Sequence, residues 1–152
     1  MTSLDGATSD HPAVAVSSVN HAAVGVRLSD RRPFDEGAVH YVVEAWAPGL
    51  AARVDEVVAW VWDADLADFL AGLAADYRAW EGERTWQTYD GDLAVSAVSR
   101  SGGRIGLTWT LRPWPDAAGG WTVSVTTWLE AGAQMASLAA DVRHFLASKQ
   151  PG

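Results

Sequence analysis

The chain changes its hydrophobic period once, near its middle, and this change restricts the possible folds more than any other feature. Before and after the middle, apolar residues alternate with polar ones, which is the pattern of half-buried β-strands. From Leu66 to Trp80 they recur at three- and four-residue steps, which predicts an amphipathic helix. Asp65 can cap its start, and Gly82 is placed to end it in a left-handed turn. A helix therefore separates two groups of strands.

The group before this helix contains four predicted strands. Runs at 13–19 and 22–29 are separated by Asn20 and His21, a possible hairpin turn, and "DRRPFDEG" then breaks the pattern. Two longer runs lie between about 38 and 62 and are separated by Pro48 and Gly49, which favours a second hairpin. In the last run an apolar face is predicted for Val54, Val58, Trp60 and Trp62, together with Glu56.

The group after the helix predicts an antiparallel meander of four short strands. "TWQTY" and "DLAVSAV" flank the Asp90 and Gly91 turn, "SGG" makes the next turn, and "RIGLTWTLR" follows it. The last strand covers 121–130, and a second helix runs from about Ala133 to Ser148.

These patterns together predict an α+β fold in the order ββββ-α-ββββ-α. We expect one antiparallel sheet of about six to seven strands with both helices packed on one face. A length of 152 residues suits one domain. Residues 13–149 are assigned to that domain, and residues 1–12, rich in Ser, Thr, Asp and Gly, to a disordered tail.

Composition argues against several classes of partner. The formal net charge is -8, and no basic stripe offsets it, so nucleic acid and membrane surfaces are disfavoured. The chain has no cysteine, which excludes disulfides and thiolate chemistry. Its start lacks a basic segment followed by a continuous apolar run, so we expect a cytoplasmic protein.

Motifs for catalysis are missing. The four histidines show no metal-binding spacing, no GxSxG motif is present, and "SGGRIG" is better explained as a hairpin turn than as a phosphate loop. We therefore predict no metal and no cofactor, and a non-enzymatic role is favoured.

The stretch "WEGERTW", from Trp80 to Trp86, contains the candidate carboxylate site. Glu81 and Glu83 flanked by aromatic residues could form an acid-base pair if one carboxyl lay in an apolar pocket. The structural alternative is that Arg84 pairs with a nearby carboxylate while the two tryptophans pack in the core. This alternative is favoured.

Seven of the nine tryptophans fall into two predicted groups. Five lie on faces assigned to the core: Trp60, Trp62, Trp80, Trp109 and Trp121. Trp46 and Trp128 lie on the opposite faces, where large aromatic residues are unusual unless they contact a partner. Contact with a protein and cover by a neighbouring segment both remain open.

The junction "FLAGLAADYRAWEGERTW", with "APGLAARVDEVVAWVW" before it and "WTVSVTTWLEAGAQMASLAADVRHFL" after it, resembles a family of actinobacterial proteins of about 150 residues with no known function. The resemblance implies no catalytic residues. More remotely, the closing strand and "LEAGAQMASLA" helix are similar to immunity proteins of bacterial toxin systems, which act by blocking a cognate toxin.

The favoured hypothesis is a protein-binding module that acts on a partner or forms a homo-oligomer, in an immunity-like role. Its weak candidate binding residues are Trp46, Trp128, Glu81, Glu83 and Arg84. The alternative is a small-molecule binder or hydrolase with a carboxylate site near the helix-strand junction.

Overall fold

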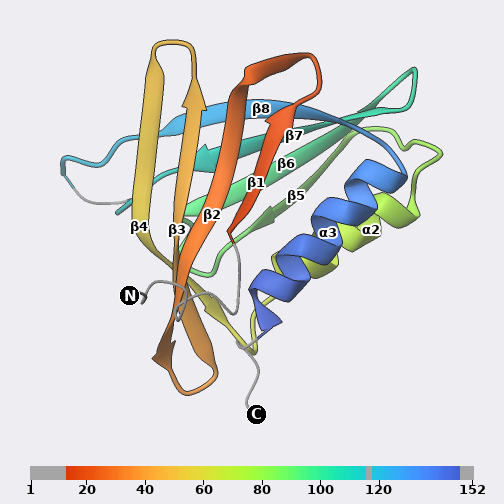
Figure 1. The fold of residues 1–152 in the computed structure, drawn as a ribbon. Coiled ribbons are helices and arrows are strands. Elements are labelled where there is room, and N and C mark those ends of the chain that lie inside the picture. The colour runs from red at the N-terminus through yellow and green to blue at the C-terminus, as the bar shows by residue number, and fades with distance from the viewer. Residues whose placement is uncertain (1–12, 116–117, 148–152) are drawn as a thin grey trace, which may run out of the picture.

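A computed structural model describes residues 13–115 and 118–147, so the predicted tail at 1–12 and the end of the second helix at 148 lie outside the described residues. The order of elements agrees with the prediction (Figure 1). Eight strands and two helices are present in this part of the chain: β1 (Val14–Ser18), β2 (His21–Asp35), β3 (Ala38–Ala47), β4 (Leu50–Trp60), α2 (Leu66–Ala75), β5 (Glu83–Gln87), β6 (Leu93–Arg100), β7 (Arg104–Leu111), β8 (Val123–Glu130) and α3 (Ala133–Phe145).

The prediction of a single sheet is wrong. The strands form two four-stranded antiparallel sheets, β1-β2-β3-β4 and β5-β6-β7-β8, each in chain order. The break between the sheets falls at the α2 connection. This connection joins β4 to β5, and these two strands do not pair with each other. The second meander instead packs across the first, with β2 and β3 contacting β8 and β3 and β4 contacting β7. One core then forms between the sheets.

The two sheets are joined at one corner, where β1 meets β8. The backbone N–H of Val19 donates to the carbonyl of Trp128 at 2.8 Å, and the N–H of Trp128 donates to Ser18 Oγ at 2.8 Å. Ser18 is buried, so these bonds are shielded from water. This pair of bonds holds one end of the sheets together.

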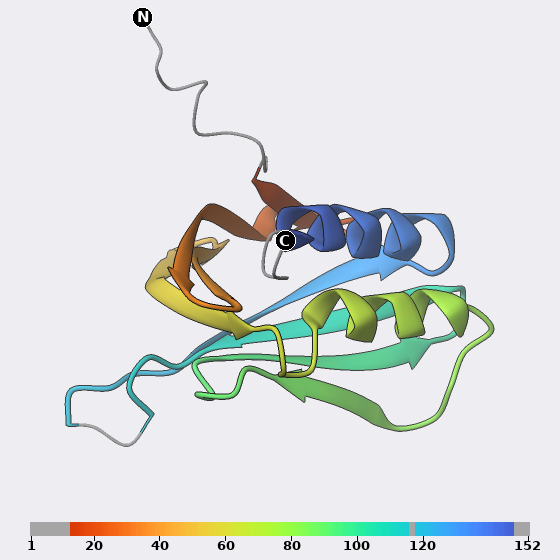
Figure 2. The same ribbon diagram turned by 90° about the horizontal axis from the view of Figure 1, so that it is seen from below.

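The two helices lie side by side, with α3 packed against β1 and β8 and α2 against β5 (Figure 2). Asp65 caps α2 as predicted, its carboxylate accepting from the N–H of Ala67 at 2.7 Å. Both helices contribute apolar residues to the same buried cluster as the strands. Arg143 of α3 also donates to Asp68 of α2 at 2.8 Å.

Helix α2 is shorter than predicted. It ends at Ala75, and Ala79 adopts φ 108°, a conformation that excludes it from a right-handed helix. Trp80 therefore does not close the helical stripe, although it still packs against the core. Gly82, at φ 81°, turns the chain into β5, but it does not end the helix.

Strand β2 is longer than predicted, because it continues through "DRRPFD" to Asp35. Its register with β3 shifts between Ser29 and Arg32 and again between Pro33 and Asp35. Irregularities of this kind accommodate a proline and the positive φ of Asp30 within a strand.

A bulge in β4 reverses the face predicted for its tryptophans. Val54 pairs with Val43 and Val57 pairs with Tyr41, so two residues of β4 lie opposite one residue of β3. The extra residue places Val57 in the core and turns Trp60 to the other face. Trp62 beyond it is 61% exposed, so the core assignment of these two tryptophans is wrong.

Trp46 and Trp128 lie on the outer faces of the two sheets, each across from a glycine on the neighbouring strand. Trp46 pairs with Gly25, and Trp128 pairs with Gly106. A Cβ on Gly25 would lie 2.5 Å from the Trp46 ring, and one on Gly106 would lie 2.7 Å from the Trp128 ring. Each indole is half-buried because it covers the bare backbone of its partner strand.

We predict that Gly25→Ala destabilises the protein by about 1–3 kcal/mol, because the new methyl group overlaps the Trp46 ring and the carbonyl oxygen of Val16, 2.8 Å away. Gly72→Ala is the matched control. Nothing lies within 4 Å of its Cβ position in α2, so it should stabilise the protein by about 0.5–1 kcal/mol. Urea unfolding measures both, and equal effects would contradict this packing.

Candidate functional site

The residues of "WEGERTW" are placed as the structural alternative expected. Arg84 donates to Asp76 at 2.6 Å, and its guanidinium carbon lies 4.4 Å from the centre of the Trp80 ring. Glu81 and Glu83 are exposed, and Glu83 accepts a hydrogen bond from Ser96 of β6. The sheet thus places Glu83 and Arg84 on opposite faces of β5.

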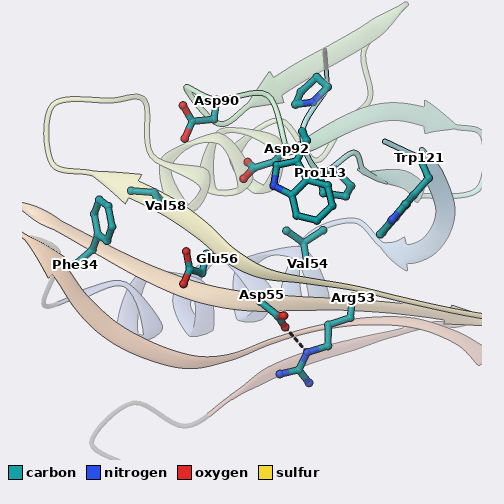
Figure 3. Close-up of a pocket in the computed structure, with 12 residues that line it drawn as sticks. Phe34, Arg53, Val54, Asp55, Glu56, Val58, Asp90, Asp92, Pro113 and Trp121 are labelled. Atoms are coloured by element: carbon teal, nitrogen blue, oxygen red, sulfur yellow. Dashed lines mark hydrogen bonds and ion pairs between the residues drawn. The ribbon is translucent and has the colours of Figure 1, made fainter. Parts of the chain in front are cut away.

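A groove with a volume of about 600 Å³ lies along β4 (Figure 3). It lies between β4 of the first sheet and two connections of the second sheet, the β5–β6 turn and the β7–β8 loop. Its lining residues are Phe34, Arg53, Val54, Asp55, Glu56, Val58, Asp90, Asp92, Pro113, Trp114, Pro115 and Trp121. We call this feature the β4 groove.

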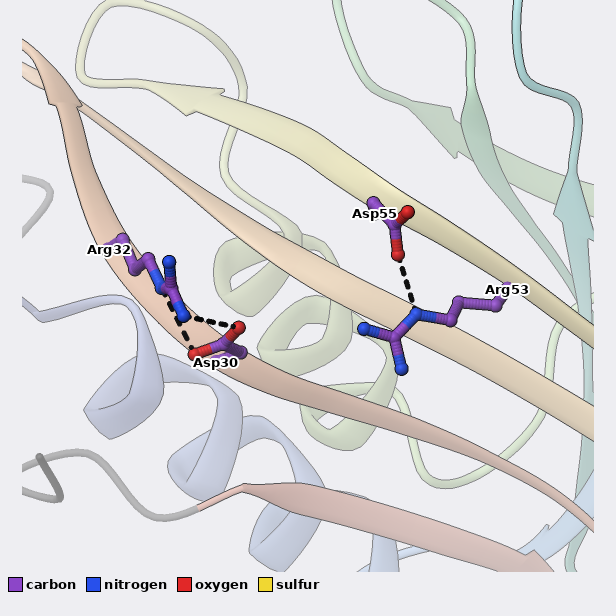
Figure 4. Close-up of polar contacts among 4 residues, drawn as sticks. All are labelled: Asp30, Arg32, Arg53 and Asp55. Atoms are coloured by element: carbon purple, nitrogen blue, oxygen red, sulfur yellow. Dashed lines mark hydrogen bonds and ion pairs between the residues drawn. The ribbon is translucent and has the colours of Figure 1, made fainter. Parts of the chain in front are cut away.

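Four carboxylates line the β4 groove: Asp55, Glu56, Asp90 and Asp92. Arg53, the one cation among the described lining residues, donates to Asp55 at 2.5 Å (Figure 4). It also lies 3.6 Å from Glu44. Asp55 raises the pKa of this guanidinium by accepting its hydrogen bond. The lining therefore carries an excess of negative charge.

Asp92 is the most buried of the four carboxylates, with only 9% of the residue exposed. Thr88 Oγ1 donates to its Oδ1 at 2.6 Å, inside the turn that connects β5 and β6. Burial raises the pKa of the Asp92 carboxyl, and the Thr88 hydrogen bond opposes this shift without cancelling it. The groove thus holds a carboxylate that is poorly solvated when it is charged.

The aromatic wall of the β4 groove comes from the β7–β8 loop. Trp114 is 68% exposed and lies between Pro113 and Pro115 at φ 51°, a conformation that is strained for a bulky residue. Trp121, 37% exposed, precedes β8 and does not occupy the core position predicted for it. Trp109 is fully buried as predicted, its indole N–H donating to Thr127 at 2.9 Å.

A row of aromatic rings extends from the groove along the same side of the molecule. Phe34 contacts Trp60 edge to face at 5.8 Å, Trp60 stacks on Trp62 at 5.5 Å, and Trp62 contacts Tyr89 edge to face at 5.1 Å between ring centroids. We call Phe34, Trp60, Trp62 and Tyr89 the aromatic row. It connects the first sheet with the β5–β6 turn of the second.

Sequence patterns did not point to the β4 groove. Its residues come from β2, β4, the β5–β6 turn and the β7–β8 loop, and no sequence spacing brings these segments together. The available signals were weak: tryptophan between two prolines in "RPWPD", and two carboxylates around a turn in "YDGD". The predicted candidates Trp46, Trp128, Glu81, Glu83 and Arg84 do not line it.

Comparison with known proteins defines the family but no activity. A model of the family of unknown function DUF6228 matches residues 17–149. The chain belongs to this family. No curated protein matches the chain, and no solved structure matches it. Membership of DUF6228 assigns no site, so the β4 groove has to be interpreted from its own residues.

Within 13–115 and 118–147, no three His, Asp or Glu side chains are grouped so that they could hold a metal ion. No helix in the same ranges is long and apolar enough to cross a membrane.

We predict that Asp92→Asn becomes more stable relative to the wild type as the pH rises from 4 to 7. The folded-state pKa of Asp92 is raised, so its contribution to stability is greatest when it is protonated and is lost as the pH rises through that pKa. Asparagine keeps an oxygen that accepts from Thr88 but carries no charge. Urea unfolding across this pH range measures the difference, with Asp90→Asn as the control. A difference independent of pH would contradict the argument.

Proposed function

We propose that this protein is a non-enzymatic protein-binding module and that the β4 groove is its contact surface. The observation that carries the proposal is the exposure of Trp114 and Trp121 on the wall of an acidic groove. Tryptophan is enriched among the residues that dominate binding energy, especially where it borders a pocket. The aromatic row extends this surface beyond the groove.

The position of the groove beside an edge strand supports the same proposal. In the part of the chain that the structure describes, β4 pairs with β3 alone, so its other edge is available. An edge strand offers unpaired N–H and carbonyl groups, to which an extended segment of a partner can add. The groove lies along that edge, so the segment would also reach the tryptophans.

The negative charge of the β4 groove favours a basic partner. The groove carries four carboxylates against one arginine that is already paired, and the whole chain has a net charge of -8. A second copy of this chain would bring like charge to the groove and would be repelled, whereas a basic protein would be attracted. We further propose that the protein belongs to an actinobacterial family and blocks a basic toxin, as immunity proteins do.

A small-molecule ligand is the second candidate function. The volume of about 600 Å³ falls within the range of small-molecule sites. This candidate keeps the carboxylate chemistry of the earlier alternative but moves it from Glu81 and Glu83 to Asp92, the buried carboxyl of the groove. Binding of a small ligand would require the groove but not Trp60, Trp62 and Tyr89, the members of the aromatic row that do not line it.

We predict that replacing both Trp114 and Trp121 with alanine weakens binding of a protein ligand at least tenfold, because a buried aromatic anchor contributes about 2 kcal/mol or more. Peptides selected from a random display library with the wild-type protein provide the ligand. Selection should favour peptides rich in Lys and Arg, and each is then titrated against the variants by fluorescence anisotropy.

Tyr77→Ala is the matched control, because Tyr77 is 55% exposed and does not line the groove. It should change affinity less than twofold. Thermal unfolding checks that all variants are folded, since exposed side chains contribute little to stability. Selected peptides that bind the double variant as tightly as the wild type would overturn the proposal, as would a selection that enriches no peptide.

A further inference from the structure

The helix-strand junction of this chain contains a complete binding arrangement for an arginine side chain. The guanidinium of Arg84 lies 4.4 Å from the centre of the Trp80 ring and donates to the Asp76 carboxylate at 2.6 Å. Guanidinium groups suit such a site because they are planar, stack on indole rings and donate to carboxylates at the same time. At this junction, an arginine of the same chain makes both contacts.

The β4 groove presents receiving groups of the same kinds, and the one arginine among its described lining residues, Arg53, is already paired with Asp55. Trp114 and Trp121 provide indole rings, and Asp90, Asp92 and Glu56 provide carboxylates that line the same space (Figure 3). Side chains from both sheets therefore face one cavity.

Neither Arg53 nor Arg112 forms an ion pair with Asp90, Asp92 or Glu56 in the described part of the chain. Arg53 donates to Asp55 at 2.5 Å and also lies 3.6 Å from Glu44. Arg112, on the loop before Pro113, donates to the carbonyl of Gly91 at 3.5 Å and is exposed. The carboxylates that line the groove thus exceed the cations available to them.

We infer that the β4 groove is a receptor for an arginine side chain of the protein partner. This inference rests on the proposed function and specifies the group that the partner inserts. The guanidinium would stack on an indole ring of the β7–β8 loop and donate to Asp90 or Glu56, as Arg84 does with Trp80 and Asp76. Lysine offers a compact charge without a planar face, so it fits this combination of groups less well.

The test uses three capped tripeptides, acetyl-Gly-Xaa-Gly-amide with arginine, lysine or citrulline at the centre. Citrulline has nearly the shape of arginine but no charge. Each is titrated into the full chain labelled with ¹⁵N, and the indole N–H signals of Trp114 and Trp121 are followed by NMR. Trp128, on the outer face of the second sheet, supplies the reference signal.

We predict that the arginine peptide moves the Trp114 and Trp121 signals with a dissociation constant in the millimolar range, as expected for a single side chain. Lysine should bind at least threefold more weakly and citrulline at least tenfold more weakly. Raising the salt concentration should weaken binding, because the contact is electrostatic and partly exposed. Asp90→Asn and Glu56→Gln should each weaken it severalfold, whereas Glu83→Gln, an exposed carboxylate outside the groove, should not.

The outcomes separate this inference from the proposed function. Equal binding of the lysine and arginine peptides overturns the arginine receptor but leaves a groove for basic partners. The inference also fails if none of the three peptides moves the Trp114 and Trp121 signals. In that case, display-selected peptides whose binding depends on Trp114 and Trp121 would still support the proposed function. If the selected peptides also bind the Trp114 and Trp121 double variant as tightly as the wild type, both proposals fail.

Discussion

The bonds between Ser18, Val19 and Trp128 are the constraint on which the arrangement of the sheets depends. They tie the end of β1 to β8 across 110 residues of sequence, at a buried corner. Helix α3 packs against β1 and β8, the two strands that meet there, and α2 packs against α3 and β5. At the far edge of the first sheet, β4 pairs with β3 alone among the described strands, and the β4 groove forms between β4 and the connections of the second sheet.

Local patterns were sufficient to predict the order of the elements. The turn at Asn20, the hairpin at Pro48 and Gly49, and the cap at Asp65 all depend on residues close in sequence, and each is present. Trp109 was also placed correctly, because it belongs to a regular strand without a bulge. Where the register is regular, alternation is enough to assign each side chain to a face.

The features that sequence could not predict depend on long-range pairing. One extra residue in β4 moved Trp60 out of the predicted core, and alternation alone does not reveal such a bulge. The division into two sheets depends on whether strands pair across the α2 connection. The hydrophobic period of each strand is the same whether the strands form one sheet or two. The β4 groove depends on both effects, so no residue of it was recognised beforehand.

Two groups in the β4 groove are held in conditions that work against stability. Asp92 is a carboxyl buried enough to raise its pKa, and Trp114 is a bulky residue kept at positive φ with its ring in solvent. Such conflicts between a residue and its surroundings concentrate at functional sites, because the rest of the fold compensates for them. At the junction, by contrast, the charge of Arg84 is paired and its ring contact is made within the chain. This difference in charge pairing supports the proposal that the β4 groove, and not the junction, binds another molecule.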